Sequence, residues 1–170
     1  MDKRLDRRRF LGGALAASSV AACSRKAAPR LLSDSEMATL SAICDQMIPP
    51  DQDPGGAWAG VANYIDRQLR GPFREFLTTY HQGLAEADRR AGGSFRSVSR
   101  EQQFDVLTDM DHDRGTRNFI ALVAAHSIQG FYGSPRHGGN RDYCSWRMLG
   151  VPASPVRGRD QYDFAKGGQS

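Results

Sequence analysis

The sequence TRNFIALVAAHSIQGF, residues 116–131, decides the fold class because it is the most apolar of the segments with helical spacing. Its apolar positions, with one histidine among them, are Phe119, Ile120, Leu122, Val123, His126 and Ile128. Steps of three and four residues place such side chains on one side of a helix. No stretch of the sequence alternates apolar and polar residues as a half-buried strand would. The sequence therefore predicts an all-α protein.

The segment LLSDSEMATLSAICDQMIPPD, residues 31–51, predicts the first helix. Ser33 and Glu36 have the spacing of a capping box, in which each side chain accepts a hydrogen bond from the other residue's backbone. Pro49 and Pro50 end the helix because proline cannot continue it. One face of this helix carries Met37, Leu40, Cys44 and Met47, with Ile43 and Ile48 beside it.

Three further helices are expected between these two segments. Their apolar stripes are Val61, Ile65 and Leu69; Phe73, Phe76, Leu77, Tyr80 and Leu84; and Phe104, Val106, Leu107 and Met110. Pro72 suits the first turn of the middle helix, and Gly92-Gly93 ends it. Ser99 and Gln102 form a second capping box that opens the last of the three.

The chain divides into three parts by composition. Residues 1–22 indicate a cleaved signal peptide, and residues 23–30 are a short polar linker. Residues 31–170 are expected to form a single small helical domain of about five helices. From Tyr132 onward the domain is rich in Gly and Pro, which predicts a long C-terminal loop segment.

The N-terminal segment has the order of a signal for export. A basic stretch precedes about 13 uncharged residues, which are too few to cross a bilayer as a mature helix but suit the core of a signal peptide. Arg7 and Arg8, followed by Phe10 and Leu11, match the twin-arginine (Tat) motif, which exports folded proteins. Asp6 stands where that motif prefers Ser or Thr. The Tat translocase is therefore an expected partner.

Cys23 follows three small residues, Val20-Ala21-Ala22, in the arrangement of a lipobox. Acylation of Cys23 would attach two lipid chains, which suffice for stable membrane anchoring. Ordinary cleavage in this Ala-rich stretch is the alternative interpretation. The expected location is periplasmic and membrane-associated, with Cys23 as the candidate lipidation site.

The charge of the chain excludes one class of partner. The net charge is +4, from 23 basic and 19 acidic residues. Five basic and two acidic residues lie within 1–22, so the remainder is nearly neutral. The basic balance therefore belongs to the signal peptide, and no DNA- or RNA-binding motif is present. We expect no nucleic-acid partner.

Motifs for cofactor binding and catalysis are not found in the sequence. It contains no G-x-G-x-x-G before a helix, no P-loop, no C-x-x-C-H and no G-x-S-x-G. We therefore expect no catalytic, cofactor-binding or metal site in this chain. His126 is interpreted as a core or interface histidine. The alternative is a small hydrolytic enzyme in which His126 forms an acid–base pair with Asp109 or Asp111.

Two cysteines remain if Cys23 is lipidated. Cys44 and Cys144 would lie in an oxidising compartment, where they could form a disulfide with each other. Cys44 falls on an apolar helix face, which is equally consistent with a buried thiol. Cys144 lies in the expected loop, and an exposed thiol there could instead bond to another protein.

Aromatic residues gather in the Gly-rich C-terminal segment. Tyr132, Tyr143 and Trp146 lie within fifteen positions of one another. Aromatic side chains on such segments are common anchors of protein interfaces. A local core role for Trp146 is the alternative.

Two motifs, residues 31–51 and GFYGSPRHGGNRDYCSWRMLGVP at 130–152, resemble the gluconate 2-dehydrogenase subunit 3 family. The resemblance covers most of the mature chain. In the second motif it is carried by Tyr132-Gly133, Gly138-Gly139-Asn140, Trp146 and Leu149-Gly150. Asn140 joins the three aromatic residues as an expected interface residue.

The resemblance implies a small, non-catalytic subunit of a periplasmic dehydrogenase complex for a sugar or sugar acid. It implies a large partner subunit of the glucose–methanol–choline oxidoreductase class, which holds FAD, and a multihaem cytochrome c partner, which holds haem c. The small subunit would escort the folded flavoprotein through Tat export and stabilise it. A stand-alone lipoprotein with a structural role is the alternative.

Overall fold

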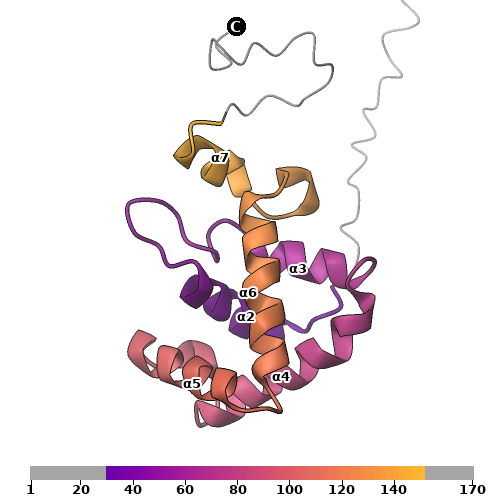
Figure 1. The fold of residues 1–170 in the computed structure, drawn as a ribbon, viewed down its shortest axis with the longest axis vertical. Helices are drawn as coiled ribbons and strands as arrows, with labels where there is room; N and C mark the ends of the chain where they lie inside the picture. The colour runs from indigo at the N-terminus through magenta and orange to yellow at the C-terminus, as the bar shows by residue number, and fades with distance from the viewer. Residues whose placement is uncertain (1–29, 152–170) are drawn as a thin grey trace, which may run out of the picture.

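Residues 30–151 are described by the structure, a computed structural model, and within this range the all-α prediction is confirmed. The described part contains no strand. Figure 1 shows the arrangement of its helices. The α-helices are α2 (Asp34–Met47), α3 (Val61–Leu69), α4 (Leu77–Arg90), α5 (Arg100–His112), α6 (Arg117–Tyr132) and α7 (Cys144–Met148).

Helix α6 is the central element of the fold. It packs against α2, α3, α4 and α5, and its C-terminal end contacts α7 (Figure 1). Contact between α4 and α6 is close: a Cβ at Gly83 would lie 2.2 Å from the ring of Phe119. The fully buried core side chains come from all the longer helices and include Leu40, Ile43, Ile65, Leu69, Tyr80, Leu84, Met110 and Val123.

Both predicted capping boxes are confirmed. Ser33 Oγ accepts a hydrogen bond from the Glu36 backbone N–H at 3.3 Å, and Glu36 Oε2 accepts one from the Ser33 N–H at 2.8 Å. Ser99 and Gln102 make the same reciprocal pair at the start of α5. These bonds satisfy backbone donors that a helix N-terminus leaves without intrahelical partners.

Two predicted boundaries are corrected. The helix expected from Pro72 begins as α4 at Leu77, because residues 74–76 form a 3₁₀ turn whose last residue leads into the helix. The segment after Tyr132, expected as loop throughout, contains two 3₁₀ turns and the short helix α7. Helix α7 has only five residues, which are too few to show a repeating apolar pattern, so the sequence does not predict it.

Candidate partner interface

Asn140 organises the turn between α6 and α7. Its side chain is fully buried: Nδ2 donates to the carbonyl of Gly133 at 2.9 Å, and Oδ1 accepts from the Ser145 N–H at 3.0 Å. These two bonds tie the end of α6 to the first turn of α7. The expectation that Asn140 contacts a partner is corrected, because its side chain is enclosed by the chain's own backbone.

The same turn holds strained backbone. Asn140, Asp142 and Tyr143 are the non-glycine residues with positive φ in the described range, at 45°, 52° and 57°. A non-glycine residue in this region costs about 1–3 kcal/mol and persists only where surrounding contacts enforce it. Part of that enforcement is a hydrogen bond from the Arg141 N–H to the Ala59 carbonyl at 3.0 Å, which fixes the turn on the loop before α3.

The three predicted aromatic residues are brought together by this turn. Trp146 Nε1 donates to the Tyr132 carbonyl at 2.8 Å, so the indole attaches α7 to the end of α6. The rings of Tyr143 and Trp146 lie 5.4 Å apart between centroids. Tyr143 and Trp146 are half-buried, whereas Tyr132 is exposed. Trp146 therefore has a local structural role, and its contact with a partner stays a prediction.

Further exposed apolar residues lie around α7, and sequence reasoning missed them. Of the eight large hydrophobic side chains exposed in residues 30–151, five come from the last two turns of α6 and from α7 and the residues after it. We call these five residues the α7 surface: Ile128, Tyr132, Met148, Leu149 and Val151. The sequence indicated this surface only weakly. Leu149-Gly150 belongs to the family motif, but only the structure shows that the Leu149 side chain is 59% exposed.

The α7 surface is flanked by positive charge. Residues 133–151 contain the exposed arginines Arg136, Arg141 and Arg147 against one acidic residue, Asp142. Arg141 also lies over the ring of Trp58, with its guanidinium carbon 5.5 Å from the ring centroid. This end of the molecule therefore combines exposed apolar side chains with guanidinium groups.

The two cysteines of the described range are separate free thiols. Cys144 is 4% exposed and donates to Asn140 Oδ1 at 3.6 Å, and Cys44 is fully buried and accepts from Ser127 Oγ at 3.8 Å. The structure does not join them, and Cys144 is not the exposed thiol expected from the sequence. Burial raises the pKa of both thiols, that of Cys44 to about 12. A disulfide from Cys144 to another protein stays a prediction.

His126 is a core residue, as interpreted from the sequence. It is 5% exposed, its Nδ1 lies 2.8 Å from the Tyr80 hydroxyl, and its ring stacks on Phe73 with centroids 3.8 Å apart. Burial lowers the pKa of His126 because the charged imidazolium would lose its hydration. The structure does not pair His126 with Asp109 or Asp111: both carboxylates are exposed on α5, and His126 Nδ1 faces the Tyr80 hydroxyl.

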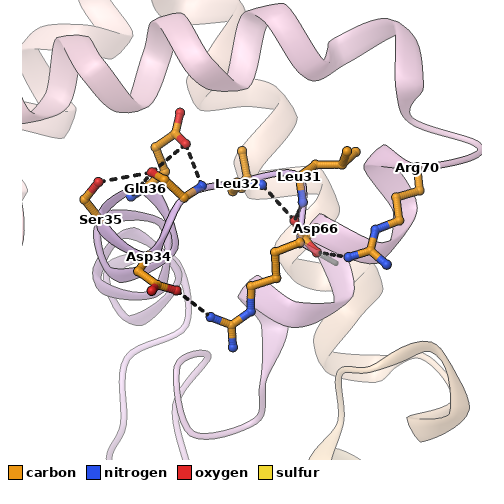
Figure 2. A network of polar contacts seen from close by, with 9 residues as sticks. Leu31, Leu32, Asp34, Ser35, Glu36, Asp66 and Arg70 are labelled. Carbon is orange, nitrogen blue, oxygen red and sulfur yellow. Dashed lines mark hydrogen bonds and ion pairs between the residues drawn. The ribbon is translucent and has the colours of Figure 1, made fainter. Parts of the chain in front are cut away.

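At another side of the molecule, Asp66 attaches the N-terminal end of the described chain to α3 (Figure 2). Asp66 is 2% exposed, and its Oδ1 accepts from the N–H groups of Leu31 at 2.9 Å and Leu32 at 3.1 Å. Its Oδ2 accepts from Arg70 at 2.9 Å. The buried carboxylate is therefore fully occupied by structural bonds and is not available for chemistry.

The start of α2 is held in the same region. Glu36 Oε1 lies 2.5 Å from His81 Nδ1 on α4, while Arg30 and Asp34 form an exposed ion pair at 3.1 Å. Burial acts to raise the pKa of Glu36, but hydrogen bonds from His81 and Ser33 outweigh it, and the pKa is lowered. The Glu36–His81 contact holds the first turn of α2 against α4.

Other kinds of site were sought in the same range. Within residues 30–151, no group of three or more His, Cys, Asp or Glu side chains is placed to hold a metal ion. In that range, too, no helix combines the length and apolarity needed to cross a membrane. A shallow hollow of about 620 Å³ lies between the end of α2 and the start of α5, beside Phe104. The Tat motif and Cys23 lie outside the described residues.

Comparison with protein families gives one match. The family model described as gluconate 2-dehydrogenase subunit 3 matches residues 34–152, which include α2 through α7, all of the motif at 130–152 and residues 34–51 of the motif at 31–51. Comparison with curated proteins and with solved structures gave no match.

Proposed function

The chain belongs to the gluconate 2-dehydrogenase subunit 3 family, and on this premise we propose that it is the small, non-catalytic subunit of an FAD-dependent sugar or sugar-acid dehydrogenase complex. FAD would be held by a large flavoprotein partner, and haem c by a partner cytochrome that passes electrons onward. The substrate would be selected by the flavoprotein.

The observation that carries this proposal is the family match over residues 34–152. The use of buried polar groups supports it. His126 is bonded to Tyr80, Asp66 to backbone N–H groups and Arg70, and Asn140 to backbone on both sides of its turn. Each of these groups serves the fold. An accessory subunit needs a stable domain and a surface for its partner.

The export signal gives the subunit its second proposed task. A flavoprotein must fold around FAD before export, so it requires a route that accepts folded cargo. Arg7 and Arg8 match the motif for that route. The small subunit would bind the folded flavoprotein in the cytoplasm and carry it through the Tat translocase to the periplasm. Acylation of Cys23 would then hold the complex at a membrane.

The test replaces the arginine pair and its neighbour together, Arg7→Lys, Arg8→Lys and Arg9→Lys. Lysine keeps the charge but lacks the planar guanidinium fork. Dehydrogenase activity should move from the periplasmic and membrane fractions to the cytoplasm, and this subunit should move with it.

Arg4→Lys is the matched control, because it makes the same change outside the motif and should leave the distribution unaltered. Periplasmic dehydrogenase activity at the wild-type level, with the triple variant of this subunit retained inside the cell, would show that the partner travels alone. The escort role would then be wrong.

A further inference from the structure

We propose that the α7 surface docks the dehydrogenase subunit, and that the matching region of that partner is an apolar patch bordered by acidic side chains. This inference rests on the proposed function, since it names the contact through which the accessory subunit would act. It also assigns the main contacts to residues outside the predicted aromatic set, above all Leu149 and Ile128.

The five apolar side chains of the α7 surface are exposed to solvent. Leu149 and Ile128 are 59% and 57% exposed, and Tyr132, Val151 and Met148 follow at 42%, 43% and 37%. Single exposed apolar residues are ordinary on a protein surface, but a group of large ones at one end of a small domain indicates an interaction site. Leu149 and Val151 also lie directly after α7, where the backbone is held by the bond from the Val151 N–H to the Trp146 carbonyl at 2.7 Å.

The exposed arginines of residues 133–151 favour a partner surface that carries acidic side chains. Arg136, Arg141 and Arg147 are exposed, and none of them forms an ion pair with another residue between 30 and 151. Guanidinium groups at the rim of an interface favour carboxylates, which they bind with two parallel hydrogen bonds. A second copy of this chain is disfavoured, because a two-fold contact would place the same arginines against each other.

The backbone of the region is fixed before any partner arrives. Asn140, Asp142 and Tyr143 hold the turn in left-handed conformations, and Asn140 bonds both flanking elements. Strained backbone of this kind concentrates at binding sites, and a pre-ordered surface loses less conformational entropy on association. The Trp146 indole N–H is bonded internally to Tyr132, so it is not available to lipid headgroups as in an interfacial membrane anchor.

The experiment uses the tagged full-length chain, expressed in its own host and purified in mild detergent. The measured quantity is the amount of FAD-containing dehydrogenase recovered per mole of this subunit. Leu149→Asp should lower recovery about tenfold, the effect of losing an anchor residue at an interface. Phe104→Asp is the matched control: Phe104 is 62% exposed and lies on α5, at the other end of the molecule from α7 (Figure 1), so recovery should match the wild type.

A second pair of variants tests the charge. Arg147→Glu should weaken recovery and reduce its sensitivity to salt, whereas Arg114→Glu, in the exposed turn before α6, should change neither. A photo-activated crosslinking residue at position 149 should join the flavoprotein, and one at position 104 should not. Circular dichroism and thermal unfolding of each variant establish that the domain is folded.

The outcomes separate the two proposals. Recovery of no flavoprotein by the wild-type chain would overturn the proposed function and this inference with it. Recovery by wild type and Leu149→Asp alike would overturn this inference alone. Equal loss with Leu149→Asp and Phe104→Asp would also overturn it, as would Leu149-dependent binding to vesicles of phosphatidylglycerol and phosphatidylethanolamine without loss of flavoprotein recovery.

Discussion

At the scale of the residue, Asp66 joins parts of the chain that are 35 positions apart through one buried carboxylate. It accepts two backbone N–H groups and one guanidinium group, which compensates for the loss of hydration. Nothing in the local sequence around Asp66 identifies this role. The residue lies in a helix with ordinary amphipathic spacing, and its partners come from the segment before α2.

Asp66→Ala should destabilise the domain by about 3 kcal/mol, because it leaves the buried backbone N–H of Leu32 and the part-buried guanidinium of Arg70 without their acceptor. Asp34→Ala is the control, since it breaks an ion pair whose Asp34 side chain is 98% exposed. Its cost should stay below about 0.5 kcal/mol. Urea unfolding of both variants measures these free energies. Similar small values for both would contradict the structural role of Asp66.

Burial of His126 should make the free energy of unfolding of the domain depend on pH. Its pKa is lowered by burial from the value of 6.5 that applies to the unfolded chain, so the unfolded state binds its proton first as the pH falls. Its contribution to stability is therefore complete above pH 6.5 and is lost as the pH falls below it, by at most about 1.4 kcal/mol per pH unit. Below the folded-state pKa the loss levels off.

The measurement compares free energies of unfolding of the wild type and His126→Phe between pH 7 and pH 5. The wild type should lose more stability over this range than the variant, although the variant is less stable at pH 7 because the Tyr80 hydroxyl loses its partner. A constant difference between the two proteins across the range would show that the buried imidazole does not titrate in this way.

At the scale of the element, α7 depends on contacts outside itself. Isolated helices of five residues do not form in water, because nucleation costs more than so few hydrogen bonds return. The side chain of Asn140 and the indole of Trp146 hold α7 in place. The five longer helices were predictable from apolar periodicity, capping boxes and Pro or Gly ends. Helix α7 was not, because its cause is tertiary and its residues carry no period.

Asn140→Ala should release α7 and leave the five longer helices intact. The change removes the acceptor of the buried Ser145 N–H and the donor to the Gly133 carbonyl, and it places alanine in a left-handed conformation that alanine disfavours. Hydrogen exchange followed by mass spectrometry should show lost protection over residues 140–151 and retained protection in α6. Asn118→Ala, at an exposed position near the start of α6, should change neither segment.

At the scale of the whole molecule, α3 connects the two regions of interest. Near its C-terminal end, Asp66 and Arg70 hold Leu31 and Leu32. At its N-terminal end, a Cβ at the N-cap Gly60 would lie 3.0 Å from the carbonyl oxygen of Gly138 in the turn before α7, and the Ala59 carbonyl accepts a hydrogen bond from the Arg141 N–H. Residues 31–32 and the turn before α7 therefore contact different parts of one nine-residue helix, the first toward its C-terminal end and the second at its N-terminal end.

The fold class and the family could be predicted from the sequence, and so could the segment in which the candidate interface lies. The three aromatic residues do lie together, but Asn140 is buried within the turn and Trp146 holds α7 to α6. Leu149 and Ile128 were not predicted as exposed interface residues, because the exposure of a side chain depends on which neighbours cover it in the fold. An apolar residue that packs in the core and one left on the surface look the same in the sequence.

The attachment at Asp66 also determines how the domain carries mechanical load. A force that pulls on the N-terminal side of the described range passes Arg30, whose ion pair with Asp34 is exposed, and then the buried attachment of Leu31 and Leu32. Two hydrogen bonds to one carboxylate oxygen share that force, and Arg70 restrains the carboxylate from its other oxygen. Tension on the backbone of Leu31 and Leu32 is therefore shared with α3 through Asp66.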